Sequence, residues 1–175
     1  MSAVTITTHP IRGFVRRSVI NPLIRGAVAL PLAIAAVPLA FVGGAGRAAA
    51  RQTRVARRFG AQIPESTGRK AGFLGVLKYS ALTVLPGFVA LVLAGLFVYG
   101  IGAGYLYPLR PDAIGGIGHM FTPSHQFSTS WGGPTLAGAW AAHALIVVGA
   151  QLGILLLLRP VNGLLDRLAR RHLVP

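Results

Sequence analysis

Two long apolar stretches constrain this chain more than any other feature. Residues 80–106 contain no charged side chain, and residues 136–158 contain seven leucines, two isoleucines and two valines. About 20 apolar residues in a helix cover a hydrocarbon core of about 30 Å. Only 11% of all residues are charged, against about 25% in soluble domains. The sequence therefore predicts an all-α integral membrane protein in which each stretch crosses the bilayer as a helix.

A third apolar segment, residues 26–46, is weaker because it is rich in alanine and contains Pro31 and Pro38. Basic residues lie on both sides of it, so both flanks favour the cytoplasm. Two interpretations stay open: the segment crosses the membrane, or it enters and returns without crossing. Residues 1–25 combine apolar side chains at helical spacing with arginines, a pattern typical of a basic amphipathic helix at a membrane interface. This helix is expected to be interrupted near Pro22.

The charge balance is strongly positive, with 17 Lys and Arg residues against three acidic ones and a net charge of +14. A basic chain binds nucleic acid, or it binds the anionic headgroups beside its own membrane spans. Nearly all the cations lie within about 20 residues of an apolar run, the range over which the positive-inside rule operates. The sequence therefore favours anionic lipids of the inner leaflet as partners, and no nucleic acid.

Residues 47–78 hold eight of these cations and one acid, Glu65, and are predicted to be cytoplasmic. Four arginines in this segment recur at a spacing that places them on one face of a helix. They are called here the arginine stripe: Arg47, Arg51, Arg54 and Arg58. The stripe is expected to face lipid headgroups, where each cation contributes about 1 kcal/mol. Residues 159–175 are expected to form a second basic amphipathic helix on the cytoplasmic surface, separated from the apolar stretch at Pro160. Helical periodicity places its apolar stripe at Val161, Leu164, Leu165, Leu168 and His172.

Residues 107–134 contain only two charged residues, Arg110 and Asp112, and are therefore predicted to be an extracytoplasmic loop. The chain would then be a multi-pass plasma-membrane protein with a cytoplasmic C-terminus. At the end of the loop, Trp131 is expected in the headgroup belt. Pro134 is expected in the first turn of the helix that follows.

An export signal is the alternative for the N-terminal region. Arg16 and Arg17, followed by an apolar run and three alanines at 48–50, resemble such a signal. Cleavage would place the cations of residues 51–78 outside the cell, which the charge distribution disfavours.

The usual residues of catalysis are scarce. The chain has no cysteine and no P-loop, HExxH or nucleophile-elbow motif, and none of its three acids lies inside an apolar stretch. His119 and His125 lack the further ligands that a metal site needs, so they are expected to be solvated loop residues. The sequence predicts a protein that is not an enzyme and has no cofactor or metal.

His143 and Gln151 are the polar residues of interest inside the last apolar stretch, where such side chains usually face a helix bundle and find a partner. The simpler interpretation is interhelical packing with hydrogen bonds. The other makes His143 a titratable group whose protonation rearranges the bundle. Two pairs of glycines at a spacing of four are predicted to allow close helix packing: Gly100 with Gly104, and Gly149 with Gly153.

Taken together, residues from about 25 to 173 resemble the sensor domain found at the N-terminus of many actinobacterial two-component histidine kinases. The resemblance is carried by three stretches. The first is the proline-containing apolar segment with the arginine-rich stretch that closes as RRFGAQIP (57–64). The second is the span that ends in YLYPLRP (105–111) with the outer loop and WGGPTLAGAWAAHAL (131–145), and the third is LLLLRPVNGLLDRLARRHL (155–173). It implies a membrane-embedded signal-input module of four spans, the second pair joined by an outer loop. This chain departs from that pattern, since a basic arm stands where a first span would lie and no kinase domain is expected.

We therefore expect a non-enzymatic, stand-alone sensor module for signal transduction. It would act by helix rearrangement on a separately encoded membrane or signalling partner, or as a homo-oligomer. The alternative is a small accessory subunit of a larger membrane complex, such as a transporter permease. An enzyme of lipid chemistry ranks third because acid–base groups are scarce.

Overall fold

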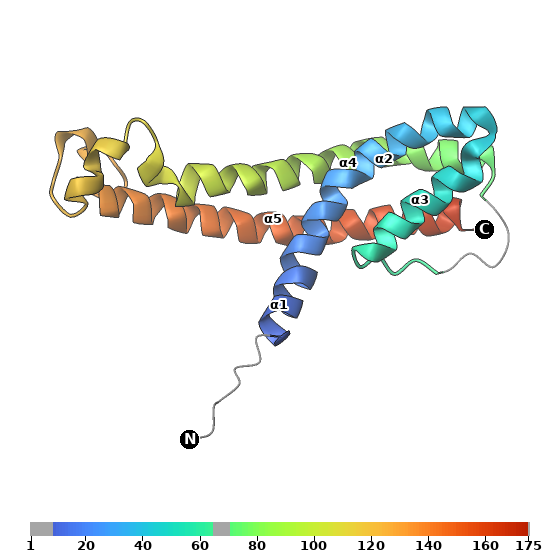
Figure 1. Ribbon diagram of the computed structural model, residues 1–175, viewed down its shortest axis with the longest axis horizontal. Helices are drawn as coiled ribbons and strands as arrows, with labels where there is room; N and C mark the ends of the chain where they lie inside the picture. Colours follow the sequence, from blue (N-terminus) through green and yellow to red (C-terminus); the bar gives the residue numbers. More distant parts are fainter. Residues whose placement is uncertain (1–8, 65–70, 175) are drawn as a thin grey trace, which may run out of the picture. The chain divides into compact units, whose positions relative to one another are not determined.

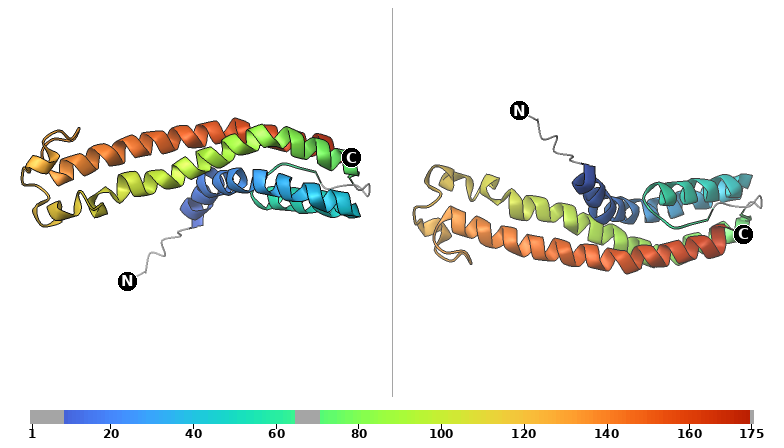
Figure 2. Two further views of the ribbon diagram at one scale, coloured as in Figure 1. Left: turned by 90° about the horizontal axis from the view of Figure 1, so that it is seen from above. Right: turned by 90° about the horizontal axis from the view of Figure 1, so that it is seen from below.

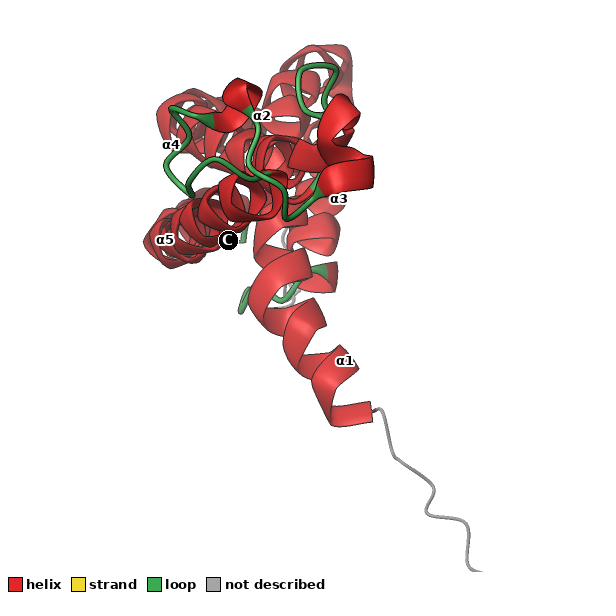
Figure 3. Ribbon diagram, turned by 90° about the vertical axis from the view of Figure 1, so that its left-hand side faces the viewer, coloured by secondary structure: helices red, strands yellow, loops and turns green. Residues whose placement is uncertain are grey.

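The protein is helical throughout the part that the structure, a computed structural model, describes: residues 9–64 and 71–174. Figure 3 shows helices and loops and no strand in these ranges, which confirms the all-α fold class. The longer helices in chain order are α1 (His9–Val15), α2 (Asn21–Leu39), α3 (Ala45–Arg58), α4 (Phe73–Gly100) and α5 (Leu136–Leu173) (Figure 1). Short π-helical and 3-10 turns join them.

Three helical stretches are long and apolar enough to cross a membrane: Ile11–Arg58, Phe73–Tyr105 and Leu136–Leu173. At 1.5 Å per residue, the 28 residues of α4 and the 38 residues of α5 extend about 42 and 57 Å. Both helices exceed a hydrocarbon core of about 30 Å. Each helix is therefore longer than a single crossing of the hydrocarbon core requires.

The first of these stretches reverses direction, which bears on the two interpretations of residues 26–46. Val42 leaves helical geometry and Gly43 adopts a φ of +77°, a left-handed conformation that glycine tolerates best. After this turn, α3 runs back along α2 (Figure 2). The Gln52 side-chain amide donates to the Leu32 carbonyl at 3.2 Å, as expected for positions equally far from the turn. The segment thus forms one arm of a helical hairpin.

The N-terminal helix is not interrupted at Pro22, contrary to expectation. A π-helical stretch, Arg16–Ile20, joins α1 to α2, and the Asn21 N–H donates to the Arg16 carbonyl. Pro22 lies where this π-helical stretch joins α2, and its missing N–H removes one backbone hydrogen bond without ending the helix. Pro31 and Pro38 likewise lie inside α2 without ending it.

The chain divides into two compact units, which are named here by their contents. The hairpin unit comprises residues 1–94 and 155–175, and the loop unit comprises residues 95–154. The helices α4 and α5 each contribute residues to both units.

Small side chains make up most of the core of the hairpin unit, so its helices approach closely. Its buried alanines on α2, the π-helical turn after it, α3 and α5 are Ala33, Ala36, Ala40, Ala45, Ala48, Ala49 and Ala169. The Ser80 hydroxyl of α4 donates to the Ala33 carbonyl at 2.9 Å. A Cβ atom on Gly26 would lie 3.0 Å from the Ala90 carbonyl oxygen and 3.2 Å from Leu158 Cδ2. The start of α2 therefore meets α4 and α5 at Ala90 and Leu158.

The helix α5 continues through Pro160 to Leu173, so the predicted tail helix is the end of α5 and not a separate element. Its buried face in the hairpin unit consists of Asn162, Leu165, Ala169 and Leu173. Packing along this face compensates for the hydrogen bond that a proline removes from a helix interior. Leu164, which the periodicity assigned to the apolar face, is 43% exposed.

In the loop unit, residues 107–134 fold into 3-10 turns around a small apolar core. This core consists of Tyr107, Ala113, Phe127, Leu136 and Ala139. Backbone bonds tie the loop to the start of α5, from Ser124 N–H to the Pro134 carbonyl at 2.8 Å and from Ala137 N–H to the Met120 carbonyl at 3.0 Å. Residues 107–134 are thus a folded loop that is bonded to the start of α5.

Candidate functional site

Gln151 joins α5 to the end of α4 inside the loop unit. Its side chain is 8% exposed. Its Oε1 accepts a hydrogen bond from the Tyr105 hydroxyl at 2.7 Å, and its Nε2 donates to the Phe97 carbonyl at 3.0 Å. A buried polar group that keeps its hydrogen bonds fixes the register of the helices that it joins. Gln151 is therefore a positioning residue between α4 and α5.

His143 lies one helical turn after Ala139 and beside Tyr107. Its Nδ1 is 2.8 Å from the Ala139 carbonyl oxygen, so this nitrogen carries a proton that it donates. Its ring stacks on Tyr107 with 4.2 Å between centroids and 22° between planes. These contacts agree with the packing interpretation. The titratable interpretation stays a prediction.

The two glycine pairs have different surroundings. A Cβ atom on Gly100 or Gly104 would lie 3.1 or 2.5 Å from the Val147 side chain, so this pair allows α4 and α5 to approach within the loop unit. Gly149 and Gly153 meet no described atom within 4 Å of the position of a Cβ atom. The second pair therefore leaves a small-residue face of α5 open.

Trp131 and Pro134 precede α5 as exposed residues. Trp131 is 86% exposed. Pro134 lies before the helix, which begins at Leu136, and the Thr135 hydroxyl accepts a hydrogen bond from Gly138 N–H at 3.1 Å. The N-cap is thus Thr135, in the role that such hydroxyls commonly play. Gly133 has a φ of +92°, as a permissive turn before the helix requires.

The arginine stripe lies on α3 of the hairpin unit. All four of its side chains are exposed, while Ala48, Ala49 and Gln52 on the opposite face are buried. The helix therefore presents a cationic face outward. Contact of this face with lipid headgroups stays a prediction.

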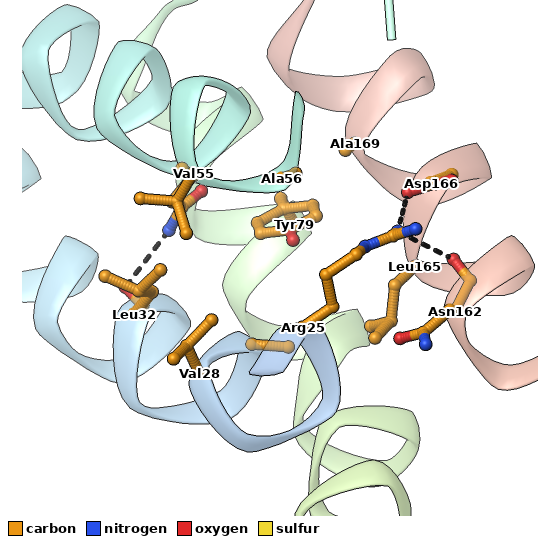
Figure 4. A pocket seen from close by; sticks show the side chains of 12 residues that line it. Arg25, Val28, Leu32, Val55, Ala56, Tyr79, Asn162, Leu165, Asp166 and Ala169 are labelled. Carbon is orange, nitrogen blue, oxygen red and sulfur yellow. Dashed lines mark hydrogen bonds and ion pairs between the residues drawn. The ribbon is translucent and has the colours of Figure 1, made fainter. Parts of the chain in front are cut away.

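An ion pair between Arg25 and Asp166 links the start of α2 to α5, and sequence reasoning did not find it. Arg25 Nη2 pairs with Asp166 Oδ1, both side chains being 13% exposed, and also donates to the Asn162 carbonyl at 3.3 Å (Figure 4). Asp166 lies beyond the apolar stretch that ends at Leu158. Burial raises the pKa of its carboxyl group, and the positive charge of Arg25 opposes that shift. The only signal in the sequence was a single acid within a basic tail.

This ion pair lines a small cavity whose walls are mostly apolar and whose volume is about 30 Å³, enough for one or two water molecules. Gln52 and Asn162 also line it. They are 5% and 4% exposed, and neither Gln52 Oε1 nor Asn162 Oδ1 accepts a hydrogen bond from any residue that the structure describes. Bridging water would satisfy both acceptors. The cavity is too small for an organic substrate.

No group of three or more His, Asp or Glu side chains that could hold a metal ion occurs in residues 9–64 and 71–174. His119 and His125 both lie in the loop unit. No protein-family model, no curated protein and no solved structure matches the chain.

Proposed function

We propose that the chain is a non-enzymatic membrane-embedded sensor, a signal-input module that acts through helix rearrangement and a cytoplasmic partner. The resemblance to the sensor domain of actinobacterial two-component kinases supports this proposal. The observation that carries it is that α4 and α5 each contribute to both compact units. A displacement of either helix at the folded loop would be passed to the hairpin unit along a continuous helix.

In this proposal residues 107–134 lie outside the cell, and the hairpin and C-terminal tail lie on the cytoplasmic side of the plasma membrane. The positive-inside rule supports this orientation, because α3 carries five arginines and residues 107–134 carry one. The hairpin need not cross the membrane. Its arm α2 starts beside Leu158, where the apolar stretch of α5 ends, and beside Ala90 of α4, and it continues past Ser80. In this proposal residues 80–90 of α4 therefore lie beside the hairpin, and the crossing begins after Ala90.

Two polar connections support a coupled movement of helices. Gln151 ties α5 to α4 in the loop unit, and the Arg25–Asp166 pair ties α5 to α2 in the hairpin unit. Both lie on α5, so sliding or rotation of this helix would break the hydrogen bonds of Gln151 and the ion pair of Asp166. Buried polar contacts of this kind favour discrete arrangements over continuous drift.

The partner can be tested with a photo-crosslinking residue at Arg54, an exposed position on α3. The sensor proposal predicts a crosslink to a separately encoded kinase or response regulator in intact cells. Leu145, 72% exposed on α5, is the control position and is expected to crosslink lipid. Absence of any signalling protein at Arg54 would contradict the proposal.

The second candidate is an accessory subunit of a larger membrane complex. It is favoured by exposed apolar side chains on and near the hairpin turn, since Ile34, Phe41 and Val42 are 60%, 68% and 75% exposed. Large exposed apolar patches mark contact with protein or membrane. A crosslink from Phe41 to a permease or transport ATPase would favour this candidate over sensing.

A further inference from the structure

An open cleft in the hairpin unit is lined by arginines from separate parts of the chain. Its volume is about 750 Å³, within the range of about 300–1,000 Å³ that is usual for small-molecule sites. The arginines that line it are Arg16, Arg17, Arg25, Arg57 and Arg58. We call it the arginine cleft. It lies between the N-terminal helix and the end of α3.

The cleft has unneutralised positive charge. Arg25 is paired with Asp166, and Arg57 bonds to the backbone and hydroxyl of Thr53. Arg16, Arg17 and Arg58 have no carboxylate partner among the described residues. The described acids are Asp112 and Asp166, each paired with another arginine. Guanidinium groups gathered in this way match the geometry and charge of a phosphate group.

The position of the cleft favours a lipid phosphate. Pro22 and Arg25 line the cleft, and both bond to the turn of α5 that follows Leu158, where its apolar stretch ends. On α1, next to the cleft residue Gly13, Ile11 and Phe14 are 71% and 69% exposed. A helix with exposed apolar side chains beside arginines is typical of the bilayer interface. Neutral donors and acceptors are also available, since Asn21 and Gln62 line the cleft.

We propose that the arginine cleft binds the phosphate-bearing headgroup of an anionic phospholipid. Arg16, Arg17 and Arg58 contact the phosphate oxygens, and the exposed face of α1 lies against the acyl chains. The inference rests on the membrane placement proposed above, though not on a signalling role. It differs from general attraction to an anionic surface because it assigns the lipid to one cleft.

The test uses the full chain in detergent and native mass spectrometry with added phosphatidylglycerol or phosphatidylcholine. The cleft variant is Arg16→Gln with Arg17→Gln. The control variant, Arg167→Gln with Arg171→Gln, removes the same charge from exposed positions that lie outside both the cleft and the arginine stripe. We expect phosphatidylglycerol to bind the parent chain at least tenfold more tightly than phosphatidylcholine. The cleft variant is expected to lose this preference and the control variant to keep it.

Helicity measured by circular dichroism shows whether each variant folds, and Arg58→Gln provides a second cleft variant. If the cleft and control variants lose the preference for phosphatidylglycerol equally, the lipid does not bind in the cleft. The attraction would then be a non-specific effect of net charge. Displacement of phosphatidylglycerol by millimolar inorganic phosphate, or by a short single-stranded RNA, would overturn the lipid assignment. A chain that stays monodisperse without detergent would instead overturn the membrane placement itself.

Discussion

The ion pair between Arg25 and Asp166 makes the most demanding prediction. Asp166→Ala would leave the Arg25 guanidinium 13% exposed and without its carboxylate. Removing one partner of a buried pair costs about 3–5 kcal/mol, because the other charge stays desolvated. Arg25 keeps its bond to the Asn162 carbonyl and some contact with water, so the lower value, about 3 kcal/mol, applies. At 1.4 kcal/mol for each factor of ten, detachment of α2 becomes about a hundredfold more frequent.

The assay is the rate of thiol labelling at Ala33→Cys, in a chain that has no other cysteine. Ala33 is 1% exposed and its carbonyl accepts from Ser80 of α4, so a reagent reaches this position only after α2 detaches. Asp166→Ala should raise the labelling rate about a hundredfold relative to Ala33→Cys alone. Arg167→Ala, which removes an exposed neighbouring charge, should leave the rate within about threefold, since exposed charges contribute about 0–1 kcal/mol.

A double variant, Arg25→Met with Asp166→Leu, removes both charges together. It tests whether the cost of Asp166→Ala comes from leaving the charge of Arg25 buried and unpaired. Apolar replacement of a whole buried pair is often neutral or stabilising, so the labelling rate should return to within about tenfold of the parent rate. An Asp166→Ala rate within twofold of the parent would refute the reasoning. It would mean that this pair does not hold α2 against α5.

Five further substitutions, at four positions, test the loop unit in detergent, with unfolding followed by tryptophan fluorescence. Gln151→Leu should lower the free energy of unfolding by about 1–3 kcal/mol because the hydroxyl of Tyr105 loses its acceptor, and a chain as stable as its parent would contradict this. Gly104→Ala should lower the free energy of unfolding by about 1–3 kcal/mol, because the added Cβ atom would meet the Val147 side chain. Gly149→Ala should raise it by up to about 1 kcal/mol through helix propensity. If Gly104→Ala were the more stable of the two, the packing described here would be contradicted. Thr135→Ala should lower the free energy of unfolding by about 1 kcal/mol because the helix loses its N-cap hydroxyl, whereas Thr135→Ser keeps this hydroxyl and the stability. Equal losses of stability in both variants would show that the hydroxyl does not cap the helix.

Much of the fold could be predicted from the apolar pattern. The stretches 80–106 and 136–158 lie mainly in the helices α4 and α5, because long apolar runs have few alternatives to a helix in a membrane. The role of Gln151 followed from the same reasoning, since a polar group in such a helix needs a partner. These features depend on local composition alone.

The features that could not be predicted depend on contacts between distant residues. Pro160 predicted a break, yet α5 continues because Asn162 and Leu165 are buried in the core of the hairpin unit. The hairpin turn lies at Gly43, beyond Pro31 and Pro38, which stay inside α2. A glycine can allow a turn, but only the packing of α3 against α2 determines that the chain turns there.

The Arg25–Asp166 pair joins residues separated by 141 positions, so no local pattern could indicate it. Helical periodicity even misplaced the buried face of the tail, because it grouped Leu164 with the apolar residues. The actual face includes Asn162 and Asp166, which pair with α2. A helix that packs on polar partners does not follow the apolar periodicity of a surface helix.

The most direct test of the membrane arrangement is labelling of single cysteines in intact cells with a membrane-impermeant maleimide. Ser128 in the loop unit and Ala50 on α3 are both exposed, so each cysteine is reachable from its own side of the membrane. The proposed orientation predicts that Ser128→Cys is labelled in intact cells and Ala50→Cys only after permeabilisation. The reverse pattern, or labelling of both positions in intact cells, would contradict it.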